Sequence, residues 1–278
     1  MTSQLIKRII KNALSEDIGK GDITTSAIVR GKNKGMAQAI AKDSFIVAGI
    51  EVFEATFKII DRNIKVKKLF QDGYRAKKGD VIAEVSGSLS GILKAERVSL
   101  NLFQRMCGIA ALTEKYVEAV QCTKAKIMDT RKTAPGLRVL DKMAVRIGGG
   151  RNHRIGLYDG VLIKDNHIEA AGGITSAVKA QRKSPFREMK IEVETKNIKE
   201  VKEALGCGVD IILLDNMSVP VIKKAVDFVA GRALLEASGN VSLKNVANIA
   251  ATGVDFISVG ELTHSVHAAD ISLKIKTC

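Results

Sequence analysis

The sequence contains no tryptophan, only three prolines and no long apolar run. Aromatic residues make up 4% of its 278 positions, too few for the stacking surface that single-stranded nucleic acid requires. No apolar segment approaches the roughly 18 residues of a membrane-spanning helix. Residues 1–11 are polar and basic and do not resemble a secretory signal. We therefore expect no association with membranes.

The sequence is also poor in cysteine. Its four cysteines, Cys107, Cys122, Cys207 and Cys278, are scattered, and no two have the spacing of metal ligands. So few cysteines in so long a chain are typical of reduced thiols rather than of a disulfide framework. We expect a cytoplasmic protein.

Positive charge is abundant by contrast. Lys and Arg number 44 against 30 Asp and Glu, which gives a net charge of +14 and favours anionic partners. The basic residues are spread along the chain, and no zinc-finger spacing or aromatic RNA-binding motif accompanies them. The pattern therefore predicts no nucleic-acid partner. The charge pattern indicates a solvated basic surface on which some of the cations bind small anions.

The second half of the chain repeats one pattern, in which a short apolar run ends in polar residues and a helical stretch follows. The runs are residues 126–130, 161–165, 190–195, 210–215, 233–238 and 255–260. Strand, helix and strand at this spacing form the unit of a parallel sheet. Nearly continuous apolar strands such as IILL indicate burial on both faces. The pattern predicts a (β/α) barrel, with an open doubly wound sheet as the alternative.

The first 110 or so residues follow a different pattern. It predicts helices at 4–14 and 50–60, strands at 36–48 and 64–70, and a hairpin at 81–93. A longer helix is expected at 96–113, with Leu100, Phe103 and Cys107 on its buried side. These elements form a separate α+β domain.

Active sites in (β/α) barrels lie at the carboxyl ends of the strands. Here those ends carry both cations and carboxylates, followed by two short turns. The charged residues are Asp129, Arg131, Lys132, Lys164, Asp165, Glu192, Glu194, Asp215 and Glu236, and the turns are Ser238, Gly239, Asn240 and Ser258, Val259, Gly260. Buried charges need partners, so packing alone does not explain this set. It predicts a polar functional site.

The residue types suggest how the site is divided. Arg131, Lys132, Arg154 and Lys164 could bind carboxylates or phosphates, and His153 could donate to an anion. Glu194 and Asp215 suit ribose hydroxyls or Mg²⁺, and the two turns suit a phosphate. The pattern favours phosphoribosyl transfer but does not by itself distinguish it from other sugar-phosphate reactions.

Eight short motifs, in order and at matching spacing, make the chain resemble the quinolinate phosphoribosyltransferase family from residue 16 to residue 273. The motifs are residues 16–25 (EDIGKGDITT), 96–113 (ERVSLNLFQRMCGIAALT), 130–138 (TRKTAPGLR), 153–154 (HR), 164–167 (KDNH), 192–194 (EVE), 214–216 (LDN) and 236–239 (EASG). The resemblance implies that quinolinate and phosphoribosyl pyrophosphate give nicotinate mononucleotide, CO₂ and pyrophosphate in NAD biosynthesis, with Mg²⁺ as cofactor.

The resemblance also implies the architecture. It predicts an incomplete, seven-stranded α/β barrel at 112–266 and an N-terminal α/β sandwich domain at 1–111, joined by the C-terminal segment 267–278. This is the type II phosphoribosyltransferase fold. The expected assembly is a homodimer, or a hexamer built as a trimer of dimers, in which the N-terminal domain of one chain caps the barrel of the other.

Roles for single residues follow from the same resemblance. Lys132, Lys164, Glu194 and Asp215 would be catalytic, with Glu194 and Asp215 holding Mg²⁺ directly or through substrate and water. The substrate-binding set is Arg97 (from the neighbouring chain), Arg105 (at the interface or pocket edge), Thr130, Arg131, Lys132, His153, Arg154, Lys164, Glu194, Asp215, Ser238, Gly239, Asn240, Ser258, Val259 and Gly260.

The chain departs from the family pattern at three positions. Ala134 stands where the family usually has Thr, Cys107 stands where it has Ser, and Asn240 stands where a second Gly is common. Asn tolerates left-handed backbone angles, so the turn at Asn240 is expected to persist.

Three alternatives remain open. A paralogue associated with molybdate transport shares several motifs, although Gln104 and Arg105 favour the quinolinate enzyme. A non-catalytic anion or nucleic-acid binder would leave Glu194 and Asp215 unexplained. Residues 72–87 resemble a biotinyl or lipoyl module, but only as a similar β fold.

Overall fold

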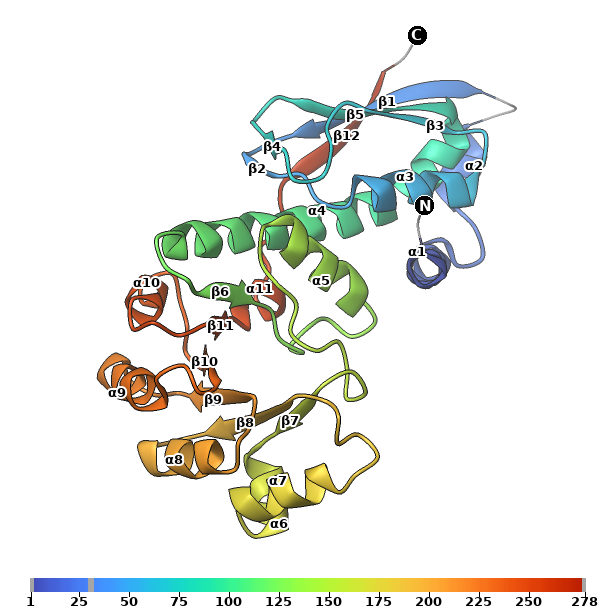
Figure 1. Cartoon of the computed structure of the whole chain (residues 1–278). Helices are drawn as coiled ribbons and strands as arrows, with labels where there is room; N and C mark the ends of the chain where they lie inside the picture. Colours follow the sequence, from blue (N-terminus) through green and yellow to red (C-terminus); the bar gives the residue numbers. More distant parts are fainter. Residues whose placement is uncertain (1–2, 30–32, 277–278) are drawn as a thin grey trace. The chain divides into compact units, whose positions relative to one another are not determined.

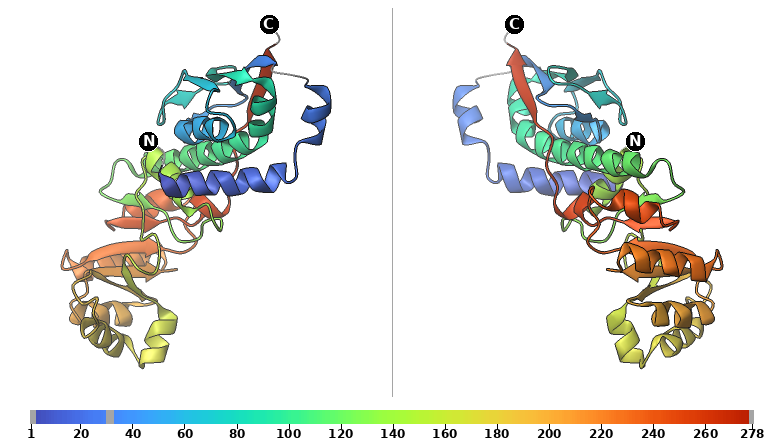
Figure 2. Two further views of the ribbon diagram at one scale, coloured as in Figure 1. Left: turned by 90° about the vertical axis from the view of Figure 1, so that its right-hand side faces the viewer. Right: turned by 90° about the vertical axis from the view of Figure 1, so that its left-hand side faces the viewer.

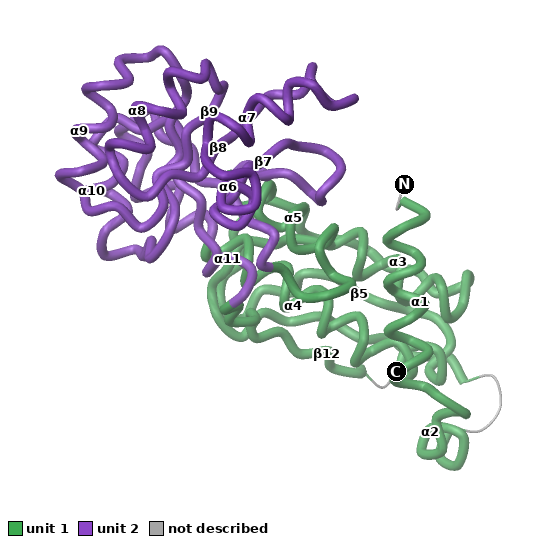
Figure 3. Tube along the Cα trace, turned by 90° about the horizontal axis from the view of Figure 1, so that it is seen from below, with its two compact units in different colours: residues 1–112, 133–149, 265–278 green, residues 113–132, 150–264 purple. Residues whose placement is uncertain are grey.

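The computed structural model describes residues 3–29 and 33–276. It divides into two compact units (Figure 3). Unit 1 contains residues 1–112, 133–149 and 265–278, and unit 2 contains residues 113–132 and 150–264. The sequence prediction assigned all of 112–266 to the barrel, whereas residues 133–149 belong to unit 1. Residues 1–2 and 277–278 of the predicted sandwich domain lie outside the described residues, as does Cys278.

Unit 1 is built on an antiparallel sheet in the order β12 (Ile271–Lys276), β1 (Lys34–Ala41), β5 (Val81–Ser88) and β3 (Lys65–Lys68). The C-terminal strand β12 runs beside β1, with Met36 opposite Lys276 and Ala41 opposite Ile271 (Figure 2). The C-terminal segment therefore completes the N-terminal sheet. A two-stranded sheet joins β2 (Phe45–Ile46) and β4 (Arg75–Ala76).

Helices α3 (Ile50–Ile60) and α4 (Leu89–Val120) cover this sheet and fill the core of unit 1 (Figure 1). The Phe53 ring lies 5.0 Å from Phe57 and 5.2 Å from Phe103 between ring centroids. The predicted helix at 50–60 is confirmed, and so is the buried stripe of Leu100, Phe103 and Cys107. Helices α1 (Gln4–Ile18) and α2 (Ile23–Ile28) begin at side-chain caps from Ser3 and Asp22.

The predicted hairpin at 81–93 is wrong in its second half. Strand β5 ends at Ser88, and α4 begins at Leu89 and runs for 32 residues. Glycine and serine at 86–91 suggested a turn, but Gly91 lies inside the helix. A Cβ atom at Gly91 would lie 3.0 Å from Ile64 Cδ1, so close packing explains the glycine there.

Unit 2 contains a parallel sheet of six strands. They are β6 (Lys126–Met128), β7 (Val161–Ile163), β8 (Ile191–Thr195), β9 (Ile211–Asp215), β10 (Leu234–Ser238) and β11 (Phe256–Ser258), arranged in the order β6-β11-β10-β9-β8-β7. Every predicted run contains one of them. Each neighbouring pair is parallel, as predicted.

The sheet is an incomplete barrel, because its edge strands β6 and β7 do not pair with each other within the described residues. Seven strands were predicted, but the sheet of the described residues has six, with one isolated parallel bridge between Arg151 and Met128 beside β6. Helices α8 (Ile198–Gly206), α9 (Val219–Val229) and α10 (Val246–Ala250) lie on one side of the sheet (Figure 1). A doubly wound sheet would carry helices on both faces, so the barrel prediction is confirmed.

The remaining helices are short. They are α5 (Arg138–Ile147) in unit 1, and α6 (Asp165–Ala171), α7 (Ile174–Arg182) and α11 (Glu261–His264) in unit 2. No helix among the described residues is both long enough and apolar enough to cross a membrane.

Helix α5 is bound to α4 by a buried ion pair. Arg105 donates from Nε to Asp141 Oδ1 at 2.8 Å and from a terminal nitrogen to Oδ2 at 2.9 Å. The Asp141 side chain is fully buried, and it also accepts the Ala134 N–H at 3.2 Å. This bidentate contact explains why residues 133–149 belong to unit 1. It gives Arg105, which the sequence assigned to the interface or pocket edge, a structural role.

We expect Arg105→Met to lower the free energy of unfolding by about 3–5 kcal/mol, because it leaves a buried carboxylate without its cation. Arg97→Ala, an exposed position on the same helix, is the control and should change stability by less than about 0.5 kcal/mol. Urea denaturation of both variants measures the difference. Equal stabilities would show that the Arg105–Asp141 pair is not structural.

Candidate active site

A pocket of about 480 Å³ opens at the carboxyl ends of the strands of unit 2. Its lining consists of Thr130, Arg131, Lys132, His153, Arg154, Leu162, Lys164, Glu194, Leu213, Asp215, Asn216, Glu236, Ser238, Gly239, Asn240 and Ser258. Most residues of the predicted substrate-binding set are therefore brought together in one cavity. Leu162, Leu213, Asn216 and Glu236 line it without having been predicted to bind substrate.

Four predicted residues are not part of this lining. Arg97 and Arg105 belong to unit 1. Val259 is buried, and its N–H donates to Met128 O at 2.9 Å, so that N–H is already used within the sheet. Gly260 is followed directly by α11, where its carbonyl accepts the N–H groups of Thr263 and His264. Of the turn predicted at Ser258, Val259 and Gly260, only Ser258 lines the pocket.

One ion pair joins the cationic and acidic sides of the pocket. Lys164 Nζ lies 3.0 Å from Glu194 Oε2, with the lysine half-exposed and the glutamate largely buried. Alternation along β8 points Glu192 and Glu194 to the same face, as predicted. Lys164, which follows β7, thereby stabilises the carboxylate of Glu194 in the neighbouring strand. Both side chains line the pocket, where one ligand can contact them together.

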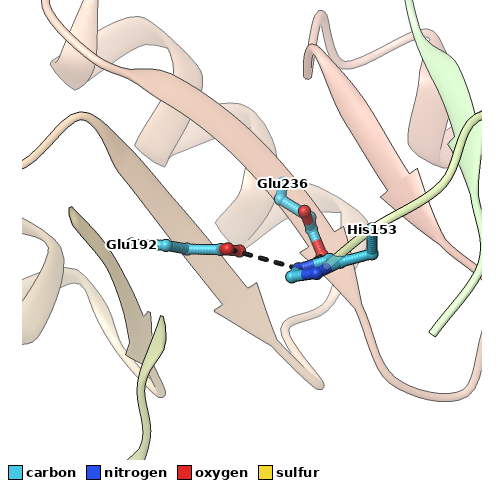
Figure 4. Close-up of side chains that lie close together, drawn as sticks. All are labelled: His153, Glu192 and Glu236. Atoms are coloured by element: carbon cyan, nitrogen blue, oxygen red, sulfur yellow. Dashed lines mark ion pairs between the residues drawn. The ribbon is translucent and has the colours of Figure 1, made fainter. Parts of the chain in front are cut away.

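A second group of charged side chains joins His153 to both Glu192 and Glu236 (Figure 4). Its Nε2 is 3.2 Å from Glu192 Oε2 and 3.7 Å from Glu236 Oε1. The backbone N–H of Arg154 donates to His153 Nδ1 at 2.7 Å. Because Nδ1 accepts that bond, a neutral His153 carries its proton on Nε2 and donates it toward Glu192.

The hydrogen bond to Nδ1 argues against a metal centre in this cluster. The ligand atoms of His153, Glu192 and Glu236 lie within 4.8 Å of one another, close enough to hold an ion. A metal would need the Nε2 lone pair, however, and that nitrogen carries the proton. The three side chains are therefore better described as a hydrogen-bonded group, of which His153 and Glu236 line the pocket.

Glu236 is the most perturbed acid of the site. Burial, reinforced by the charge of Glu192, raises the pKa of Glu236 to about 8, although His153 and a hydrogen bond from Ser258 oppose the shift. Ser258 Oγ lies 2.5 Å from Glu236 Oε1. Glu236 is thus largely protonated at neutral pH, which keeps the floor of the pocket less negative than its composition indicates.

Two arginines make one side of the pocket strongly cationic. Arg154 donates to Gly160 O at 3.0 Å, and its buried Nε has no hydrogen-bond partner among the described residues. Burial lowers the pKa of the Arg154 guanidinium, and the charge of Arg131 lowers it further. Two guanidinium groups that repel each other favour an anion between them.

The turn after β10, predicted to bind a phosphate, has left-handed backbone angles. Gly239 has φ 90° and Asn240 has φ 49°, so the prediction that Asn240 tolerates such angles is confirmed. Ser238, Gly239 and Asn240 all line the pocket. Such turns are suited to anions.

Comparison with known proteins shows which family the chain matches. Residues 22–107 match the N-terminal domain of quinolinate phosphoribosyl transferase, and residues 109–274 match its C-terminal domain. The chain belongs to the quinolinate phosphoribosyltransferase family. Members of this family are decarboxylating pentosyltransferases of NAD biosynthesis, and the chain is one of them.

Individual relatives cover nearly the whole chain. A chloroplastic nicotinate-nucleotide pyrophosphorylase [carboxylating] of Arabidopsis thaliana is 48% identical over 98% of this chain and 83% of its own length. A probable nicotinate-nucleotide pyrophosphorylase [carboxylating] of Bacillus subtilis is 41% identical over 97% of this chain and 93% of its own length. The crystal structure of the Ehrlichia chaffeensis enzyme, 45% identical, covers 99% of both chains with a TM-score of 0.94.

We expect the raised pKa of Glu236 to make stability depend on pH. Between pH 4.5 and about 8 the folded chain retains a proton that the unfolded chain has released, so the free energy of unfolding falls as pH rises. One proton gives a slope of at most about 1.4 kcal/mol per pH unit. Glu236→Gln removes this contribution.

Urea denaturation at several pH values in this window measures the effect as the difference in slope between the parent and Glu236→Gln. Glu188→Gln, with a highly exposed side chain, is the matched control and should follow the parent. If Glu236→Gln has the same slope as the parent, Glu236 does not keep its proton in the folded chain.

Proposed function

We propose that the pocket of unit 2 transfers the phosphoribosyl group of phosphoribosyl pyrophosphate to quinolinate, with release of CO₂ and pyrophosphate. The observation that carries this proposal is that one cavity is lined by arginines and lysines, by the carboxylates of Glu194 and Asp215, and by the turn at Ser238, Gly239 and Asn240. Quinolinate is a dianion and its co-substrate bears phosphates and ribose hydroxyls, so each region has a matching substrate group.

The cationic side would bind quinolinate. Arg131 and Arg154 provide the forked donors that suit carboxylates, and Lys132 adds a third charge. His153, fixed between Asp129 and Glu192, would support the ring, since its backbone N–H donates to Asp129 Oδ1 at 2.9 Å. A dianion there would relieve the repulsion between the two guanidinium groups.

The acidic side and the turn would bind phosphoribosyl pyrophosphate. Glu194 and Asp215 would accept hydrogen bonds from the ribose hydroxyls. Ser238, Gly239 and Asn240 would hold the 5′-phosphate through backbone N–H groups, with Ser258 beside them. Thr130, at the end of β6, lies at the edge of the same cavity.

The acidic pair also fits Mg²⁺. One oxygen of Glu194 binds Lys164 and one oxygen of Asp215 accepts from Asn216, so each carboxylate keeps a second oxygen. Mg²⁺ usually takes one or two carboxylates and completes its shell with water and substrate phosphates. When bound, the ion would supply positive charge that neutralises the pyrophosphate leaving group.

The chain's residues then position the reactants and stabilise charge. The quinolinate nitrogen forms a bond to the ribose C1 as the bond from C1 to pyrophosphate breaks, with Lys132 and Lys164 neutralising developing negative charge. The ring nitrogen becomes cationic. It accepts the electron density left when CO₂ departs from the adjacent carbon, which then takes up a proton. This step requires no further cofactor.

A coupled assay with Mg²⁺, phosphoribosyl pyrophosphate and carboxyl-labelled quinolinate tests the proposal. We expect the parent to release labelled CO₂ and form nicotinate mononucleotide. Arg131→Ala and Lys132→Ala should each lower kcat/KM about 100-fold or more, because each removes a charge that contacts the reactants. Chelation of Mg²⁺ should abolish turnover.

Lys223→Ala is the control, because Lys223 is exposed on α9, lies outside the pocket lining and pairs with Asp227 in its own helix. It should retain the activity of the parent. A folded parent that forms neither product would overturn the proposal, and other pyridine or purine acceptors would then be screened.

We further propose a homodimer in which Arg97 of one chain reaches quinolinate in the barrel of the other. Arg97 is exposed on α4, and the pocket lining contains no residue of unit 1. A hexamer would be built from three such dimers. The free thiols of Cys107, Cys122 and Cys207 suit a reducing compartment, so we place the reaction in the cytoplasm.

Complementation between variants tests the shared site. Arg97→Ala and Lys132→Ala chains should each be inactive alone, but a mixed dimer contains one intact site formed by the Lys132 barrel of one chain and the Arg97 of the other. If the two chains are refolded together and pair at random, about half of the dimers are mixed, and one of the two sites in each mixed dimer is intact. The mixture should therefore regain about a quarter of the parental activity. No recovery in verified mixed dimers would contradict a shared site.

A further inference from the structure

The turn that follows β10 is tied to the end of β9 by a pair of asparagine side chains. Asn240 Nδ2 donates to Asn216 Oδ1 at 2.9 Å. Asn216 in turn donates from Nδ2 to Asp215 Oδ2 at 2.9 Å. A continuous side-chain path therefore runs from the phosphate turn to the carboxylate of Asp215.

The backbone around this path is fixed on both sides. Asn216 has φ 53°, and its N–H donates to Ser238 O at 2.9 Å. Beyond the turn, Asn245 donates from Nδ2 to Asn240 O at 2.9 Å. The two left-handed asparagines are thus held in single conformations by neighbours on either side.

Gly239 shows how closely the carboxamide of Asn216 packs beneath the turn. A Cβ atom at Gly239 would lie 2.2 Å from Asn216 Oδ1, well inside contact distance. Gly239 also has φ 90°, where a side chain is strained. The turn therefore accepts the Asn216 side chain only because residue 239 is glycine.

We propose that Asn216 and Asn240 are positioning residues that fix the phosphate turn relative to Asp215. The inference rests on the proposed function, in which the turn binds the 5′-phosphate and Asp215 the ribose hydroxyls of one substrate.

The physical effect is preorganisation. Both asparagines are exposed, so their mutual hydrogen bond adds little to global stability. Its main contribution is to hold two phosphoribosyl-binding elements at one separation before the substrate arrives. Without it, binding must order the turn, and affinity for that substrate falls.

Asn240→Gly tests the inference, because glycine keeps the left-handed backbone and removes only the side-chain bridge. We expect KM for phosphoribosyl pyrophosphate to rise about 3- to 10-fold, as loss of one net hydrogen bond predicts. KM for quinolinate, kcat and the midpoint of thermal unfolding should change little. Calorimetric titration with phosphoribosyl pyrophosphate should show the same loss of affinity.

Asn216→Gly and the double variant complete a thermodynamic cycle. If the two side chains act through one hydrogen bond, the double variant should bind phosphoribosyl pyrophosphate no more weakly than the single variant with the lower affinity. Ala230→Gly is the matched control, since Ala230 also has a left-handed backbone, with φ 48°, but lies outside the pocket lining. It should leave both KM values unchanged.

The outcomes separate this inference from the proposed function. A parent that forms no nicotinate mononucleotide would overturn the proposed function. An active parent whose Asn240→Gly variant keeps its KM for phosphoribosyl pyrophosphate would overturn the positioning role alone. Fully additive effects of the two single variants, or an equal rise in KM for quinolinate, would also overturn it.

Discussion

Buried carboxyl groups are the constraint on which the rest of unit 2 depends. Asp129, Glu192, Glu194 and Glu236 all lie buried at or near the strand ends of the parallel sheet. A buried acid requires a donor, a cation or a proton. The donors that the fold provides are His153, Lys164 and Ser258, and Glu236 retains its own proton. Meeting this requirement brings together the side chains that line the pocket.

The same pocket brings together the two kinds of charge that the proposed chemistry needs. Arg131 and Arg154 supply cations to the lining, and Glu194 and Asp215 supply carboxylates. The raised pKa of Glu236 lowers the negative charge of the lining. Charge placement and positioning, rather than covalent catalysis, therefore account for the proposed reaction.

Much of this could be predicted from the sequence, because apolar runs and the charges that end them are local patterns. The six strands and most lining residues were predicted in this way. The start of α4 was not, since Gly91 looked like a turn until its packing against Ile64 was known. The Arg105–Asp141 pair and the Asn216–Asn240 bridge depend on side-chain conformations of residues distant in sequence, which no local pattern specifies.

If one pocket in unit 2 holds both substrates in a fixed orientation, a crystal structure with quinolinate, Mg²⁺ and an unreactive analogue of phosphoribosyl pyrophosphate should show it. We expect the two ring carboxylates against Arg131 and Arg154, and the 5′-phosphate on the turn at Gly239 and Asn240. A ring bound outside this pocket, or a phosphate bound against the arginines, would show that the pocket does not hold the substrates in this way.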